Sequence, residues 1–212
     1  MKTNALLSIV LALVLSGVAY SQETSSTDDN WSVQGKNRTR TLGFYGGLYG
    51  AYSPVGDRSA QWYSARVGVS FNHRWGIGLA GSVLNYDYEL SELVTDGTYR
   101  LQAGYTGMFV ERMLNLAPWS KINLSWTSGA GVAFYQYNKD FREDRPWYEE
   151  TIDTENFAAN ELGLELQFKT FGRWWAGLYG SYRLTSPIKL MGTDERFLTD
   201  FSAGVSLKYG LL

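Results

Sequence analysis

Residues 62–87 read WYSARVGVSFNHRWGIGLAGSVLNYD, and this stretch decides the fold. Its first eleven residues alternate between large apolar side chains, such as Val67, and small or polar ones. Such alternation is typical of a half-buried β-strand, because successive side chains point to opposite faces of a sheet. A second alternating run begins at Trp75, so only His73 and Arg74 separate the two runs. The stretch therefore predicts a β-hairpin with a tight polar turn.

The same period continues from Thr41 to the C-terminus, in segments rich in Tyr, Trp, Phe and Gly. Eight segments follow the pattern, which predicts an all-β chain without helices. The expected strands span residues 41–53, 62–72, 75–87, 98–111, 121–137, 157–170, 174–185 and 197–210.

The connections between these strands alternate in length. Residues 73–74 and 171–173 are short, whereas the other connections, 54–61, 88–97, 138–156 and 186–196, are longer. Short turns at one end and long loops at the other are typical of an antiparallel up-and-down transmembrane β-barrel. The segment 112–120 (RMLNLAPWS) is long where a tight turn belongs, and we expect it to pack on the periplasmic rim.

The N-terminus has the three parts of a secretory signal. Lys2 supplies a positive charge, residues 6–15 (LLSIVLALVL) are apolar, and small residues at positions 19 and 21 mark a cleavage site after Ser21. Residues 22–40 are polar without a period. We therefore expect a signal peptide at 1–21, a flexible periplasmic leader at 22–40 and a barrel at 41–212.

Composition narrows the class of protein further. The chain has no cysteine, which excludes disulfides and Cys-based metal sites. Its formal net charge of −2 gives no reason to expect nucleic acid as a partner. After the signal no apolar run is long enough for a spanning helix, so a membrane protein of this sequence must be a barrel.

The two faces of each strand differ in side-chain size. An eight-stranded barrel that carries ligands in water places its apolar face inside, whereas a barrel in lipid places it outside. An eight-stranded lumen is just filled by side chains, so the small and charged residues suit the interior and the large ones suit lipid. Aromatic residues near strand ends are expected to form two interfacial girdles, namely Trp62, Trp75, Tyr99, Trp119, Tyr135, Trp174, Tyr182 and Tyr209.

Charged residues also fall on the small-residue faces. A buried charge is tolerated when it is paired, so we expect an ion-pair network that plugs the lumen, with Glu165 and Asp200 near Arg183. A conducting pore is the alternative, although water-filled channels have about sixteen strands. The expected network comprises Arg66, Arg100, Glu161, Glu165, Lys169, Arg183, Asp200 and Lys208.

Two other features of the sequence are candidate sites. His73 is the only histidine, but no carboxylate is adjacent to orient its ring, and the turn explains it without catalysis. The connection 138–156 carries seven acidic and three basic residues, without the ligand spacing of a calcium site. It is either a solvated loop or a recognition surface formed by Phe141, Trp147 and Tyr148. We expect no catalytic residue, no metal and no cofactor.

The chain resembles the small outer-membrane barrels of Gram-negative bacteria. The resemblance rests on the eight amphipathic segments, on hairpins such as WWAGLYGSYRL and on the terminal strand FSAGVSLKYGLL, although Leu212 replaces the family's usual terminal aromatic residue. The chain is most similar to the protein A and protein X type barrel domains, in versions common in Bacteroidota. The resemblance implies a place in the bacterial outer membrane, contact with its lipid and lipopolysaccharide, and insertion by the barrel-assembly machinery.

Three functions follow from this resemblance. The first is a non-enzymatic barrel with a structural, adhesion or interaction role, and the second is an accessory subunit of a larger outer-membrane transport, secretion or assembly complex, with a protein partner in that membrane. The third is a lipid A-modifying enzyme. Such enzymes have a catalytic His at the outer side of the barrel, whereas His73 is expected at the opposite rim.

Overall fold

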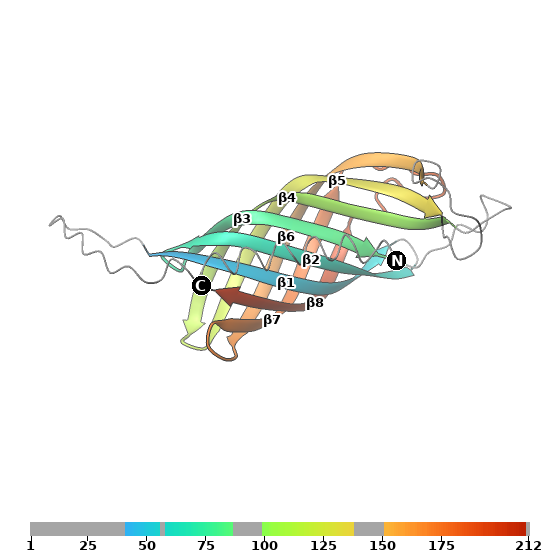
Figure 1. Ribbon diagram of the computed structural model, residues 1–212. Coiled ribbons are helices and arrows are strands. Elements are labelled where there is room, and N and C mark those ends of the chain that lie inside the picture. The colour runs from blue at the N-terminus through green and yellow to red at the C-terminus, as the bar shows by residue number, and fades with distance from the viewer. Residues whose placement is uncertain (1–40, 56–57, 87–98, 138–150, 211–212) are drawn as a thin grey trace, which may run out of the picture.

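A computed structural model describes residues 41–55, 58–86, 99–137 and 151–210 of the chain. In these residues each strand pairs antiparallel with the next in sequence, and the last pairs with the first, so the sheet is a closed up-and-down barrel (Figure 1). The predicted eight-stranded all-β fold is therefore confirmed. The strands are β1 (Leu42–Val55), β2 (Arg58–Phe71), β3 (Trp75–Asn85), β4 (Tyr99–Ala117), β5 (Ser120–Tyr137), β6 (Thr151–Lys169), β7 (Trp174–Thr185) and β8 (Asp200–Gly210).

The barrel closes along the seam between β1 and β8. The two strands pair from Tyr45 with Gly210 to Tyr52 with Ala203. A Cβ atom added to Gly204 would collide with the backbone of β1 at the carbonyl of Gly50, so the seam requires a glycine there. Closure satisfies the edge hydrogen-bonding groups that an open sheet would expose.

Three tight turns lie at the end of the barrel where β1 begins and β8 finishes, which we call the turn end. In the β2–β3 turn the two central residues, Asn72 and His73, have positive φ angles of 53° and 52°. The amide of Arg74 donates to the carbonyl of Phe71 at 3.0 Å. Positive φ at both central residues belongs to the hairpin turn whose twist matches that of the strands. The opposite end is called the loop end.

Two predicted connections were wrong in length. β1 continues to Val55 and β2 begins at Arg58, so residues 56–57 alone join them where a long loop was expected. The segment 112–120 is not a separate rim element, because β4 continues to Ala117 and β5 begins at Ser120. Alternation simply persists in this segment, with Met113 buried and its neighbour Leu114 exposed.

The wall of the barrel has unequal height. β4, β5 and β6 contain 19, 18 and 19 residues, whereas β3, β7 and β8 contain 11, 12 and 11. At the turn end β4 pairs with β3 only as far as Arg112 but with β5 as far as Ala117, so the β4–β5 hairpin extends beyond the β2–β3 turn. Two strand starts also differ from the prediction. β6 begins at 151 rather than 157, and β8 begins at 200 rather than 197.

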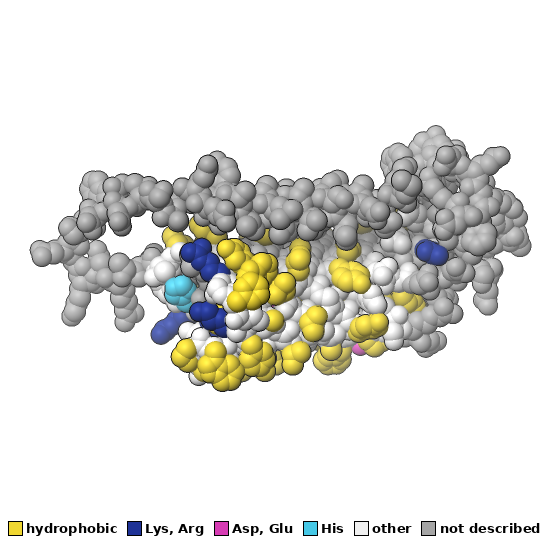
Figure 2. Space-filling model, turned by 60° about the horizontal axis from the view of Figure 1, so that its bottom comes forward, with side chains coloured by type: hydrophobic (Ala, Val, Ile, Leu, Met, Phe, Trp, Pro, Cys, Tyr) yellow, Lys and Arg dark blue, Asp and Glu magenta, His cyan; other side chains and the backbone are white. Residues whose placement is uncertain are grey.

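The apolar face of the sheet is the outer face. Large side chains stand exposed along every strand, and examples are Leu162 at 58%, Leu178 at 61% and Phe201 at 68%. The residues between them are buried in the lumen, as in the regular alternation of β1. Figure 2 shows yellow apolar side chains spread along one side of the barrel. A water-soluble carrier would show the reverse arrangement.

The predicted aromatic girdle is partly wrong. Trp62 and Tyr135 are 3% and 0% exposed and lie inside the barrel, because their position in the alternation points them inward although they are close to strand ends. Trp75 and Trp119 are exposed at the turn end, at 50% and 61%. The remaining members, Trp174, Tyr182 and Tyr209, are intermediate in exposure, and the side chain of Tyr99 lies outside the described residues.

The tryptophans inside and outside the barrel are expected to respond differently to lipid. Trp126 is 53% exposed on the outer wall of β5, whereas Trp62 is shielded by the wall. In vesicles of lipids brominated in the acyl chain, we expect Trp126→Phe to lose a clear part of the quenchable fluorescence and Trp62→Phe to lose none. Steady-state quenching measures both. Equal loss in the two variants would contradict the outward apolar face.

Candidate functional site

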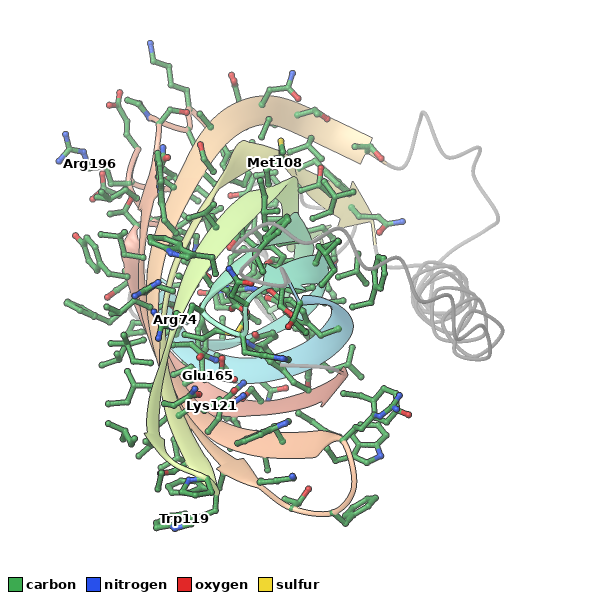
Figure 3. All side chains as sticks on the ribbon, turned by 90° about the vertical axis from the view of Figure 1, so that its left-hand side faces the viewer. Arg74, Met108, Trp119, Lys121, Glu165 and Arg196 are labelled. Atoms are coloured by element: carbon green, nitrogen blue, oxygen red, sulfur yellow. The ribbon has the colours of Figure 1, made fainter. Side chains whose placement is uncertain are left out.

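The lumen contains three layers of buried cations, centred on Lys208, Arg66 and Arg183. Lys208 is close to the turn end of β8, Arg66 lies midway along β2, and Arg183 is close to the loop end of β7. None of the three is more than 3% exposed. Figure 3, viewed from the turn end, shows Glu165 and Lys121 within the ring of strands and Trp119 at the tip of the β4–β5 hairpin.

The Lys208 layer joins three strands that are far apart in the sequence. The Nζ atom of Lys208 lies 3.0 Å from Glu111 Oε2 on β4 and 2.9 Å from Glu165 Oε2 on β6. Glu165 also accepts hydrogen bonds from Gln167 at 2.9 Å and from the hydroxyl of Ser206. Both carboxylates are thus held in one hydrogen-bonded group, which is the condition under which buried charges are tolerated.

The Arg66 layer crosses the middle of the lumen. Arg66 Nη2 donates to Glu161 Oε1 at 3.2 Å and to the hydroxyl of Tyr179 at 3.0 Å, and its other terminal nitrogen donates to Ser125 at 3.1 Å. The hydroxyls of Tyr179 and Tyr105 donate to the two oxygens of Glu161 at 2.6 and 2.7 Å. Side chains from β2, β4 and β7 therefore meet at one carboxylate of β6, and Arg66 also links this group to β5.

The Arg183 layer is stabilised by an aromatic ring. Its guanidinium carbon lies 3.7 Å from the ring centroid of Trp62, and Nη2 donates to Ser202 at 3.0 Å. A desolvated cation over a tryptophan face is an attractive pair. The inward position of Trp62, which the girdle prediction missed, is therefore explained by its contact with Arg183.

Above Arg183, the β7–β8 connection forms an apolar cap. Ile188, Leu190, Phe197 and Leu198 are each less than 8% exposed and belong to a cluster with inward residues of β1 to β6. Backbone hydrogen bonds hold the connection in place, including Ile188 N to Glu195 O at 2.9 Å. The late start of β8 follows from this burial. Further contacts are Tyr135 Oη to Met191 O at 2.8 Å and a bond from Met191 N to Asp153.

The eight predicted lumen residues fall into two groups. The structure places five of them deep inside the barrel, and these are Arg66, Glu161, Glu165, Arg183 and Lys208. Arg100 and Asp200 are intermediate in exposure near the loop end, and Lys169 is exposed at the turn end of β6. The predicted proximity of Glu165 to Arg183 is wrong, because Glu161 is the residue on β6 that stands opposite Arg183, and Glu165 lies one layer lower beside Lys208.

Two buried ionic residues were missed by sequence reasoning. Glu111 is 1% exposed and bonds to Lys208, but the predicted strand ended at this residue and its face was not assigned. Lys121 is 5% exposed, and its Nζ lies 4.3 Å from the ring centroid of Trp175. Continued alternation with Phe109 and Met113, which are both buried, was the signal that would have placed Glu111 inside.

Other predicted positions carry no assembled site in the structure. His73 occupies the β2–β3 turn, at the end opposite the cap. Phe141, Trp147 and Tyr148 lie outside the described residues. Among the residues that are described, no group of three or more His, Asp or Glu side chains is arranged to hold a metal ion. The same residues include no helix that is long and apolar enough to cross a membrane.

Comparison of the sequence with protein-family models and with curated proteins finds no match. Comparison of the structure with solved structures does. The N-terminal β-barrel domain of Pseudomonas aeruginosa OprF has a TM-score of 0.50 and 9% identity, covering 81% of this chain and 99% of that one. Neisserial surface protein A (NspA) has a TM-score of 0.51 and 8% identity, covering 79% and 96%.

The chain has the fold of the small eight-stranded outer-membrane barrels. Identities below 10% show the fold alone. What this barrel does must therefore be argued from its own residues, and those residues describe a lumen occupied by ion pairs and covered by an apolar cap.

Removal of the central cation of the Lys208 layer tests the network. In Lys208→Met, Glu111 and Glu165 remain buried without their ammonium partner, so we expect the free energy of unfolding to fall by about 3–5 kcal/mol. Urea titration of the folded protein, followed by tryptophan fluorescence, measures the change. Lys189→Met, an exposed change at the loop end, is the matched control and is expected to stay within about 0.5 kcal/mol of wild type.

The triple variant Lys208→Met, Glu111→Gln, Glu165→Gln separates charge from packing. It removes both unpaired carboxylates, so most of the lost stability is expected to return. A single variant as stable as wild type, or a triple variant no better than the single one, would contradict a role for ionic pairing in the lumen.

Proposed function

We propose that the protein is a non-enzymatic integral outer-membrane barrel that acts through its surfaces and not by passing solutes through its centre. One observation carries this proposal. The outer wall is apolar and exposed, with Phe201 at 68%, while the lumen is crossed by paired charges such as Arg66 and Glu161, 3.2 Å apart. An apolar outer wall is stable in contact with lipid, and the lumen of an eight-stranded barrel is narrow enough to be filled by side chains.

The outer-membrane location is supported by three observations. The fold is that of the outer-membrane barrels, the N-terminal residues have the parts of a secretory signal, and aromatic side chains such as Trp75 and Trp119 stand exposed at the turn end. Export through the inner membrane would leave the chain ends, and therefore the turn end, in the periplasm. The loop end then faces outward.

The surface role follows from what the loop end presents. The connection that caps the lumen buries its apolar residues and leaves Lys189, Asp194, Glu195 and Arg196 exposed. These residues form a charged surface on a rigid support, as expected for structural, adhesion or interaction functions. His73, at the opposite end, has no place in chemistry on an outer-leaflet lipid, and this supports a non-enzymatic role.

Two candidate contacts for an accessory role beside a larger complex are the polar leader 22–40, which lies outside the described residues, and the segment 112–120. That segment is part of the β4–β5 hairpin, and its exposed residues Leu114 and Leu116 continue the lipid-facing wall. It therefore does not favour a protein partner over lipid. Purification from native membranes in mild detergent tests this point, because a protein that co-purifies in a fixed ratio would support the accessory role.

Orientation is testable because the chain contains no cysteine. We expect Arg196→Cys, at the loop end, to react with a membrane-impermeant maleimide on intact cells. Arg74→Cys, in the β2–β3 turn, is the matched control and should react only after the outer membrane is permeabilised. Both residues are exposed in the structure. Labelling of Arg74→Cys on intact cells would reverse the orientation.

The closed lumen has an electrical consequence. In planar bilayers the folded protein is expected to give no steady conductance, because the Arg66 and Lys208 layers and the apolar cap occupy the lumen. Heat-modifiable migration on a gel serves as the control for folding in the same preparation. Stable channels from heat-modifiable protein would show that the lumen conducts.

A further inference from the structure

Exposed positive charge gathers at the turn end of the barrel. Arg74 lies in the β2–β3 turn, and Lys169 and Arg173 flank the β6–β7 turn; all three are exposed. Arg112, on β4, is intermediate in exposure beside them. Figure 2 shows dark-blue Lys and Arg side chains grouped around the cyan histidine at one end of the visible face, and another dark-blue side chain at the far end.

Negative charge lies elsewhere among the described residues. The turns 72–74, 118–119 and 170–173 contain no Asp or Glu. The acidic residues described in the barrel are either buried in its lumen or near the loop end. The first group is Glu111, Glu161 and Glu165, and the second is Asp153, Glu155, Asp194, Glu195 and Asp200. The cations at the turn end are thus not neutralised by neighbouring acids on the described surface.

Aromatic side chains stand between these cations. The guanidinium carbon of Arg112 lies 4.7 Å from the ring centroid of Trp75, and both residues are on the outer wall. At the longer hairpins Trp119 stacks on Phe168 with centroids 6.1 Å apart, and Phe171 lies 6.1 Å from Trp174. Exposed aromatic rings of this kind lie at the level of lipid headgroups.

We propose that this basic and aromatic turn end binds the headgroups of anionic phospholipids in the periplasmic leaflet. The inference rests on the proposed function, because it requires the barrel to span the outer membrane with its turn end in the periplasm. Phosphodiester oxygens accept from Arg74 and Arg112 on one side and from Lys169 and Arg173 on the other, while the aromatic rings pack on the glycerol and upper acyl region.

The position of Arg112 favours a lipid over a soluble ligand. β4 presents Met108 and Val110 outward, and Arg112 follows them in the same alternation. A group that contacts both Arg112 and Trp75 must therefore approach from the side of the hydrocarbon, where only membrane components are found. An acidic periplasmic protein would reach the turns but not this outer wall.

The test uses the full-length mature protein in nanodiscs of phosphatidylcholine, with and without about a third phosphatidylglycerol. Native mass spectrometry counts the lipids that stay bound, and we expect several-fold enrichment of phosphatidylglycerol that weakens with added salt. Each cation near an anionic surface contributes about 1 kcal/mol, so neutralising three of them in Arg74→Gln, Arg112→Gln, Arg173→Gln should abolish the several-fold enrichment. The variant Lys189→Gln, Arg196→Gln, at the loop end, should keep it.

Each outcome assigns the surface to a source. Equal loss in the loop-end variant, or unchanged enrichment in the triple variant, overturns the proposal. If inorganic phosphate in detergent stabilises the wild-type barrel as much as phosphatidylglycerol does, the cations bind free phosphate. If an acidic protein co-purifies with wild type but not with the triple variant, the cations bind a protein. Heat-modifiable migration in phosphatidylcholine alone shows whether the barrel is folded. A folded barrel without lipid preference would contradict this inference but not the proposed function.

Discussion

The width of an eight-stranded lumen is the constraint on which the rest of the structure depends. Such a lumen has no room for bulk water, so every charge that points inward must find its partner on another strand. Glu161 meets this requirement with Arg66, Tyr105 and Tyr179, which come from three different strands. Pairing across the lumen joins opposite walls, and the large apolar side chains are left on the outer wall.

This division between inside and outside determines which surfaces of the barrel remain exposed. The centre is occupied, so the two ends and the outer wall are the surfaces that remain exposed to other molecules. The loop end carries charges of both signs above an apolar cap, whereas the turn end carries cations among aromatic rings. The two ends thus differ in the molecules that they can attract, although they belong to one rigid sheet.

Alternation predicts most of the fold, because a strand period is a local property. It placed eight strands correctly in order and put residues such as Arg66 and Lys208 on the inner face. Partners across the lumen depend on the tilt and register of the closed barrel, so the joining of Glu111 to Lys208 was not predictable. The cap depends on packing between residues distant in sequence. Trp62 was predicted on the outer face because it is near a strand end, whereas its position in the alternation of β2 points it inward.

The contact between the last strand and the fourth has a consequence for biogenesis. Lys208 belongs to β8, which follows the other seven barrel strands in the sequence, and its carboxylate partners are on β4 and β6. A half-inserted sheet would expose two acids without a cation, which hydrocarbon tolerates poorly. The ammonium group therefore reaches both acids only when β8 is in place, so ion pairing in the lumen is completed together with the closure of the barrel.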